Sequence, residues 1–146
     1  MFFSRNCLSV DQARTISPRL LAHLGDAVFH LFERERKLLT AATVSQLHRV
    51  SSMRATARAQ AQLLDMLSDL LTEQEADLVR RARNIKPQRQ KRAEQASYRK
   101  STAFEALLGY LYVTDTGRLK QILALTLTED CKGSPGAELP NLKDRL

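Results

Sequence analysis

The segment from Ser101 to Thr114 reads STAFEALLGYLYVT, and it constrains the fold more than any other part of the chain. At about 100° per residue, its apolar side chains surround a helix almost completely. Such a helix is stable at the centre of a bundle, where neighbouring helices cover it on every side. Its one charged residue, Glu105, must therefore be paired with an arginine, protonated or bound to a metal ion.

The rest of the chain favours the same all-α class. Its 146 residues include only five glycines and four prolines, and the aliphatic residues recur at helical spacing without the alternation of strands. We expect one helical domain over residues 17–130, a short N-terminal extension over residues 1–16, and a flexible C-terminal tail over residues 131–146.

Capping signals predict where the helices begin and end. Ser17-Pro18 predicts a helix start, and that helix runs to about Leu39. Thr43 and Thr72 cap two further helical stretches, and the first of these has a possible break at Ser51-Ser52. Pro87 ends the next helix near Asn84, so residues 85–97 are expected to form a basic loop before a helix from Tyr98 to Val113. Gly117 then separates that helix from a last one, which carries the apolar residues Leu119, Ile122, Leu123, Leu125 and Leu127.

The first long helix has an apolar face and a polar face, and it contains a glycine. One face carries Leu20, Leu21, Leu24, Val28 and Leu31, and a narrow polar stripe carries Arg19, His23, Asp26, His30 and Glu33. Gly25 costs about 1 kcal/mol relative to alanine inside a helix, so close approach of another segment is expected there. Gly109 offers the same opportunity on the central helix. The two nearby histidines could bind a transition metal with Asp26, although simple exposure is the commoner reason for such a pattern.

Positive charge is concentrated in one segment. The chain carries 23 Lys and Arg against 16 Asp and Glu, a net charge of +7. Residues 80–100 contain nine basic residues and one acidic residue, while the remainder is close to neutral. Concentrated charge points to a polyanion, with nucleic acid as the first candidate. The alternative is a solvated basic loop that has no partner.

Several classes of protein are disfavoured. No apolar run approaches the roughly 20 residues of a membrane helix, and the start of the chain lacks the apolar run of a secretory signal. Cys7 and Cys131 match no metal-binding spacing and suggest no oxidising compartment. We therefore expect a protein that is not secreted and that works without a membrane, in a reducing compartment such as the cytoplasm.

Two motifs resemble known sequences. The run Leu24-Gly25-Asp26-Ala27-Val28 resembles the signature helix of the ribonuclease III family, and the run from Ser101 to Gly109 resembles that family's second acidic motif. The basic run from Arg80 to Asn84, followed by the segment that leads into Glu105, is similar to Mini-ribonuclease III, the short subclass of the family. The resemblance covers about residues 17–128 and is carried by the order of these motifs.

The sequence departs from the wider family at two positions. Ribonuclease III proper has four acidic site residues, but Ala22 and Thr102 stand here where two of them are expected. Because the short subclass resembles this chain at both positions, the resemblance implies a reduced site. Only Asp26 and Glu105 are carried over as catalytic and metal-binding residues.

The resemblance implies an endoribonuclease that depends on Mg²⁺, with Mn²⁺ as a possible substitute. It implies a ribonuclease III-like helical bundle, assembled as a two-fold homodimer, that cleaves double-stranded RNA during maturation of the large-subunit (23S) ribosomal RNA precursor. It leaves a ribosomal protein open as a further partner, and either the bacterial cytoplasm or the plastid stroma as location. The residues expected to contact RNA are His48, Arg49, Arg80, Arg83, Asn84, Lys86, Arg89, Lys91, Arg92, Tyr98, Lys100 and Thr102.

Two rival functions remain open at this point. One is a non-catalytic RNA-binding scaffold with a ribonuclease III-like fold, which the residues Ala22 and Thr102 would fit. The other is an all-α metal-dependent phosphohydrolase acting on nucleotides. That class usually has denser acidic motifs such as ExxE, and none lies here near a histidine–aspartate pair. Incubation with duplex RNA and Mg²⁺ or EDTA would distinguish the endoribonuclease from these two rivals.

Overall fold

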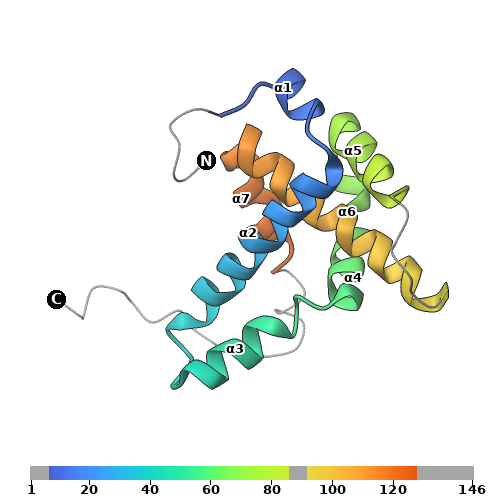
Figure 1. The fold of residues 1–146 in the computed structure, drawn as a ribbon. Coiled ribbons are helices and arrows are strands. Elements are labelled where there is room, and N and C mark those ends of the chain that lie inside the picture. The colour runs from blue at the N-terminus through green and yellow to red at the C-terminus, as the bar shows by residue number, and fades with distance from the viewer. Residues whose placement is uncertain (1–6, 86–91, 128–146) are drawn as a thin grey trace.

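The computed structural model describes residues 7–85 and 92–127, and this part of the chain is all-α, as predicted. It contains seven α-helices and one 3₁₀ helix (Figure 1). Their bounds are α1 Val10–Arg14, α2 Pro18–Leu38, α3 Val44–Ser52, α4 Ala57–Leu67, η1 Ser68–Leu70, α5 Glu73–Arg83, α6 Arg92–Thr114 and α7 Thr116–Leu125.

The helix starts follow the capping signals in the sequence. Ser17, Thr43 and Thr72 are all N-caps, and Thr72 forms a capping box with Glu75. Two boundaries differ from prediction. Helix α6 begins at Arg92 and not at Tyr98, because Ala93, Glu94, Gln95 and Ala96 favour helix and no proline or glycine interrupts them.

The other difference concerns Gly117, which does not separate two helices but lies in the first turn of α7. Asp115 supplies the cap there, since its side chain accepts a hydrogen bond from the Arg118 backbone N–H. Helix α1 is not anticipated by the sequence reading, although Ser9 and Gln12 form a capping box at its start. The expected tail, residues 131–146, lies outside the described residues, and the domain limits remain predictions.

Helix α6 is the centre of the bundle, as its sequence predicts. Figure 1 shows α2 crossing it and α4 and α5 flanking it. Ala103, Phe104, Ala106, Leu107 and Leu108 are all completely buried along it. Burial of each large apolar side chain contributes about 1.5–3 kcal/mol, so α6 anchors the core. None of the helices in the described ranges is long and apolar enough to span a membrane.

Two glycines let α2 and α6 touch backbone to backbone. A Cβ atom on Gly25 would lie 1.8 Å from the carbonyl oxygen of Glu105, and a Cβ atom on Gly109 would lie 1.9 Å from that of Leu21. No side chain fits at either distance. The close approach expected at both glycines is therefore confirmed, and each glycine faces the other helix.

The face of α2 that enters the core is not the one with most leucines. Its buried residues are Leu21, Ala22, Gly25, Phe29 and Glu33, whereas Leu20 is 66% exposed and Leu31 is 45% exposed. The leucine-rich face is therefore only partly buried, through Leu21, Leu24 and Val28, because small residues are needed where the two helix backbones touch. The ring of Phe29 then packs edge-on against Phe104 of α6, with ring centroids 5.1 Å apart.

Candidate active site

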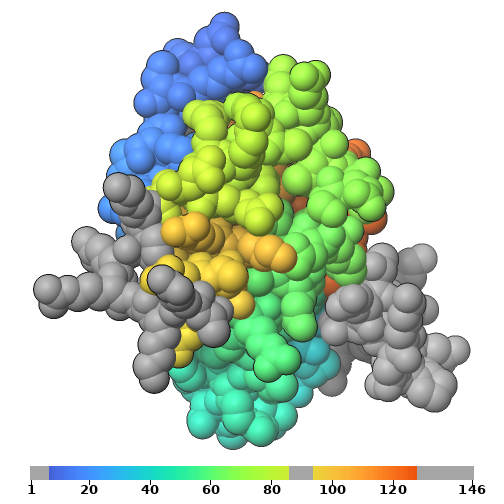
Figure 2. Space-filling view, turned by 90° about the vertical axis from the view of Figure 1, so that its right-hand side faces the viewer, coloured from blue at the N-terminus to red at the C-terminus, as the bar shows by residue number. Residues whose placement is uncertain are grey.

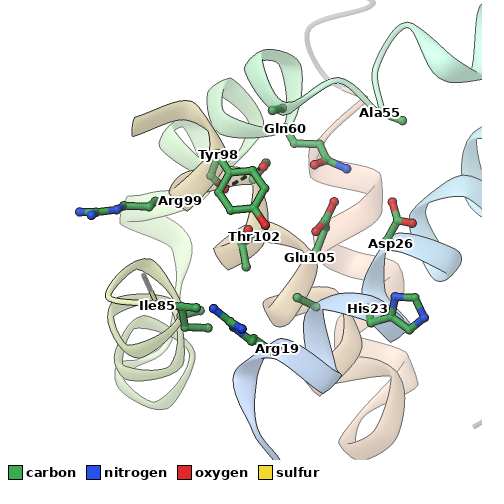
Figure 3. A pocket seen from close by; sticks show the side chains of 14 residues that line it. Arg19, His23, Asp26, Ala55, Gln60, Ile85, Tyr98, Arg99, Thr102 and Glu105 are labelled. Atoms are coloured by element: carbon green, nitrogen blue, oxygen red, sulfur yellow. Dashed lines mark hydrogen bonds between the residues drawn. The ribbon is translucent and has the colours of Figure 1, made fainter. Parts of the chain in front are cut away.

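A cleft of about 530 Å³ opens beside the crossing of α2 and α6 (Figure 3). Side chains from α2, α4 and α6 line it, together with residues near the ends of α4 and α5. The polar groups that face it are those of Arg19, His23, Asp26, Gln60, Tyr98, Arg99, Ser101, Thr102 and Glu105. Asp26 and Glu105, the two predicted catalytic residues, thus lie in one cleft.

The glycine contact explains why these two carboxylates meet. Asp26 follows Gly25 directly, and Gly25 touches the backbone of Glu105. Asp26, which is adjacent to the contact on α2, is thereby held beside Glu105, which is part of the contact on α6. Figure 3 shows both carboxyl groups pointing into the same space. Residues that lie far apart in the sequence are joined here by a helix crossing that only glycine permits.

Electrostatics make Glu105 unusual. Burial and, to a smaller extent, repulsion from the charge of Asp26 raise the pKa of its carboxyl group to about 7, while the side-chain amide of Gln60 acts in the opposite direction. Removing the charged form from water is the largest of these effects. At neutral pH the Glu105 carboxyl group is therefore poised between its neutral and charged forms, and a cation in the cleft would favour the charged form.

Other buried carboxylates in the protein have arginine partners. Glu33 accepts hydrogen bonds from Arg36 at 2.7 Å and from Arg54 at 3.1 Å, and Glu75 pairs with Arg118 at 2.9 Å. Among the described residues, Glu105 forms no such ion pair. The arginine salt bridge that composition allowed is thus absent from this part of the chain. Asp26 lies beside His30, but no described lysine or arginine pairs with either carboxylate. Two carboxylates that share a cleft in this way are the arrangement expected of a cation site.

The donor set fits a hard divalent ion. Mg²⁺ commonly binds through one or two protein carboxylates and completes its octahedron with water and phosphate oxygens. The described ranges hold no group of three His, Cys, Asp or Glu side chains of the sort that Zn²⁺ requires. His30 lies 3.4 Å from Asp26 through its Nε2 atom, but His23 does not join them in such a group. The histidine-based metal site considered from the sequence is therefore not formed here.

Ala22 and Thr102 both line the cleft. Ala22 is buried one turn before Asp26, and Thr102 is half-buried one turn before Glu105. The two positions where acidic residues were expected from the family thus face the same space as the two that remain.

The predicted RNA-contacting residues lie in several places. Tyr98 and Thr102 line the cleft with the carboxylates. A second cleft of about 420 Å³, formed by α4, α5 and α6, is lined by Arg80, Arg83, Asn84 and Lys100. Figure 2 shows these three helices together on one face. His48 and Arg49 are exposed on α3 and line neither cleft, whereas Lys86, Arg89, Lys91 and the side chain of Arg92 lie outside the described part.

Some basic residues of the second cleft are already paired. Lys100 contacts Asp65 at 2.6 Å, and Arg80 pairs with Asp77. Arg83 and Arg99 are exposed and form no ion pair with any described residue. Arg99 also lines the cleft that holds Glu105, so it connects the two surfaces.

The cleft also contains polar residues that the sequence did not indicate as site residues, among them Arg19, Gln60 and Arg99. Arg19 lies two helical turns before Asp26, and that spacing was available as a signal. Gln60 lies on the same face of α4 as Leu63, Leu64 and Leu67, where a polar residue interrupts an apolar stripe. The interruption was visible in the sequence, but its position opposite Glu105 was not.

Comparison with known proteins identifies the family to which the fold belongs. The model of the ribonuclease III domain family matches residues 19–116. A crystal structure of a protein from Fusobacterium nucleatum superposes with a TM-score of 0.70 at 26% sequence identity, covering 80% of this chain and 96% of the other. The fold and the site together define an endoribonuclease of the ribonuclease III class.

Closer relatives narrow the class. The chain is 46% identical to Mini-ribonuclease 3 of Gloeobacter violaceus, a match that covers 78% of this chain and 84% of the relative. It is also 46% identical to Mini-ribonuclease 3 of Symbiobacterium thermophilum, over 75% of this chain and 86% of the relative. The chain belongs to the Mini-ribonuclease 3 family.

Proposed function

We propose that the protein is a Mg²⁺-dependent endoribonuclease that cleaves double-stranded RNA, with Asp26 and Glu105 as its catalytic residues. The observation that carries this proposal is that Asp26 and Glu105 share one cleft and that neither forms an ion pair with a described lysine or arginine. Their mutual repulsion is relieved when a divalent cation binds between them. Mn²⁺, which accepts the same ligands, is expected to substitute.

Asp26 and Glu105 would hold the ion, and the chain contributes the shape of the site around it. When bound, the ion supplies positive charge to the scissile phosphate and lowers the pKa of the attacking water. The resemblance of the motifs implies products with a 5′-phosphate and a 3′-hydroxyl. Because the two carboxylates come from different helices, the α2–α6 crossing determines how far apart they lie.

The basic surface next to the cleft supports duplex RNA as substrate. Arg83 and Arg99 offer free positive charge, and Arg99 reaches both clefts. A-form RNA is recognised mainly through its shape, phosphates and 2′-hydroxyls, for which basic and polar residues suffice. The chain has no Trp, and single-strand binding usually relies on aromatic stacking.

A second copy of the chain is the expected partner. Leu20, Ala27 and Leu31 are exposed on the outer side of α2, and the half-buried Leu24 lies between them at helical spacing. Leu20 and Leu31 are exposed, and such an apolar stripe is unusual on a monomer. A two-fold interface through α2 would bring two sites together, one for each strand of a duplex.

The biological substrate in this proposal is the precursor of large-subunit (23S) ribosomal RNA, and a ribosomal protein that shapes this RNA is a candidate partner. The bacterial origin of the relatives favours the bacterial cytoplasm over the plastid stroma. The support for both statements is the family resemblance, and neither depends on the geometry of the site.

The test uses two substitutions with matched controls. Asp26→Asn and Glu105→Gln are expected to reduce Mg²⁺-dependent cleavage of a labelled RNA duplex by at least about 1,000-fold, since each removes a metal ligand. RNA affinity should change little. Glu35→Gln, an exposed position on α2, should cleave normally. Full activity of both site variants would refute the assignment, and binding without cleavage by the parent chain would favour the scaffold.

A further inference from the structure

Gln60 is a buried amide in the cleft that holds Asp26 and Glu105. It lies on α4, its exposed fraction is 1%, and it lines the cleft. Its Nε2 atom has no acceptor at hydrogen-bond distance among the described residues, although the amide lies near enough to the Glu105 carboxyl group to lower the pKa of that group. Figure 3 shows the amide directed toward the two carboxylates.

A buried N–H donor without an acceptor destabilises a folded protein, and such groups are rare. The surroundings of Gln60 show that a polar side chain is not needed for packing. Leu63, Leu64 and Leu67 follow it on the same face of α4 and are all buried. A leucine at position 60 would continue this stripe. The amide is therefore better explained by an acceptor that enters the cleft than by the packing of the helix.

Charge in the cleft limits what that acceptor is. Asp26 and Glu105 repel the phosphate of an RNA strand, so a strand bound between them requires donors as well as a cation. Two of the cleft side chains that can donate, Arg19 and Arg99, are exposed to solvent. Gln60, in contrast, is a buried side chain of the cleft with unused N–H groups. A neutral amide donates hydrogen bonds without competing for the cation.

We propose that Gln60 is a substrate-contacting residue of the cleavage site, whose Nε2 donates a hydrogen bond to a non-bridging oxygen of the phosphate being cleaved. This inference rests on the proposed function, because it takes the phosphate to lie at Asp26 and Glu105. The amide is anchored on a rigid helix and buried before substrate arrives. It therefore presents its donor without having to reorganise, and a donor held in this way acts most strongly on charge that develops during the reaction.

Gln60→Leu tests the proposal, with Gln62→Leu as the matched control. Gln62 lies two residues further along α4 and is exposed, so the same substitution there leaves the cleft unchanged. Three quantities are measured on the full chain: melting temperature in EDTA, Mn²⁺ affinity by calorimetry, and single-turnover cleavage of a duplex RNA with Mg²⁺. The affinity for the same duplex is measured with Ca²⁺ in place of Mg²⁺.

Gln60→Leu is expected to melt at the same or a higher temperature than the parent, because an unsatisfied amide is removed. Its Mn²⁺ and duplex affinities should stay within about threefold, while the single-turnover rate falls by about 100-fold, the effect of losing one oriented donor. Gln62→Leu should match the parent in rate and in metal affinity. Gln60→Glu, which keeps the shape but replaces the donor by an acceptor, should not restore the rate.

Two results would overturn the proposal. One is a Gln60→Leu rate within threefold of the parent. The other is a fall in melting temperature and Mn²⁺ affinity that accounts for the lost rate, which would assign Gln60 a purely structural role. The Asp26→Asn variant separates this failure from that of the proposed function. If Asp26→Asn is inactive and Gln60→Leu is active, only the role of Gln60 is refuted.

Discussion

Glu105 shows how the site works against the stability of the fold. Its carboxyl group is surrounded by the core helices, and both burial and the charge of Asp26 raise its pKa to about 7. Above that pH the metal-free protein must keep two charged carboxylates in one cleft. Residues arranged for a ligand commonly destabilise the unliganded protein in this way. Glu33 and Glu75 are also buried, but each forms an ion pair with arginine that offsets the cost of burying its charge.

Replacement of Glu105 by Gln should stabilise the metal-free protein at high pH. Between pH 4.5 and 7 the folded state binds more protons at this carboxyl group than the unfolded state, so stability falls as pH rises through that range. The shift corresponds to roughly 3 kcal/mol. In EDTA at pH 8, Glu105→Gln should therefore melt several degrees above the parent, and at pH 4 the difference should vanish.

Calorimetry across this pH range provides the measurement, with Glu35→Gln as the exposed control. Saturating Mg²⁺ should reverse the order, because the ion stabilises the parent by mass action and binds the variant more weakly. A Glu105→Gln protein that is less stable than the parent at pH 8 in EDTA would contradict the raised pKa.

At the scale of elements, the decisive feature is the contact between α2 and α6. Gly25 and Gly109 remove two side chains, and the helices approach until each glycine faces the other backbone. Each glycine lowers helix propensity by about 1 kcal/mol, which is offset by the buried surface that the approach creates. The same contact brings Asp26 beside Glu105. Stability of the core and assembly of the site therefore depend on one crossing.

Gly25→Ala and Gly109→Ala should each damage both properties. The added methyl group would lie under 2 Å from a backbone carbonyl oxygen, so the helices must separate. Overpacking of this kind costs about 3 kcal/mol or more, which exceeds the gain in helix propensity. Denaturant unfolding should show the loss. Surviving folded protein should bind Mn²⁺ more weakly.

Gly117→Ala is the matched control for the two glycine variants. A Cβ atom there would meet only the side chain of Asp115, at 3.3 Å, and the residue is exposed in the first turn of α7. Its stability should change by less than about 1 kcal/mol. Equal effects at all three glycines would show that helix propensity, and not the crossing, determines the outcome.

At the scale of the whole molecule, charge and apolar surface are separated. The basic residues of α5 and α6 gather beside the clefts, while α2 exposes leucines on its outer side. These surfaces match the two macromolecular partners of the proposed function, duplex RNA and a second copy of the chain.

Charge reversal at Arg83 and Arg99 should weaken RNA binding and its dependence on salt. Neither residue forms an ion pair with a described residue, so reversal breaks no ion pair there. Each lost phosphate contact should lower the slope of log affinity against log salt concentration by about 1. Filter binding between 50 and 200 mM salt measures this slope, and over that range the loss of one contact corresponds to about a fourfold smaller change in affinity. Arg14→Glu on α1, with the same change in net charge, should leave the slope unaltered.

A double substitution on α2, Leu20→Glu with Leu31→Glu, should convert a dimer to a monomer. Both side chains are exposed in the single chain, so folding should be largely preserved while charge is placed in the apolar stripe. Light scattering after size exclusion gives the mass. Leu70→Glu, an exposed leucine of η1, is the control. A parent protein that is monomeric at all concentrations would refute the two-fold interface.

Much of the fold was predictable from local patterns. The caps at Ser17, Thr43 and Thr72 and the central position of α6 depend on residues a few positions apart, so the sequence shows them directly. The expected basic loop over residues 85–97 was wrong in its second part, because charge was allowed to outweigh the helix propensity of residues 93–96. Helix α1 was missed although its capping box is present.

The sequence by itself determined that Glu105 is an exceptional carboxylate in a buried helix and that Gly25 and Gly109 require close contacts. Only the tertiary structure decided that those contacts are with each other's helices, that Asp26 and Glu105 share a cleft in which no described arginine forms an ion pair with either carboxylate, and that Gln60 faces them. The physical reason is the distance along the chain over which the deciding interactions act. Helix formation is governed by neighbours within one or two turns, whereas burial and charge in a cleft depend on segments that only packing brings together.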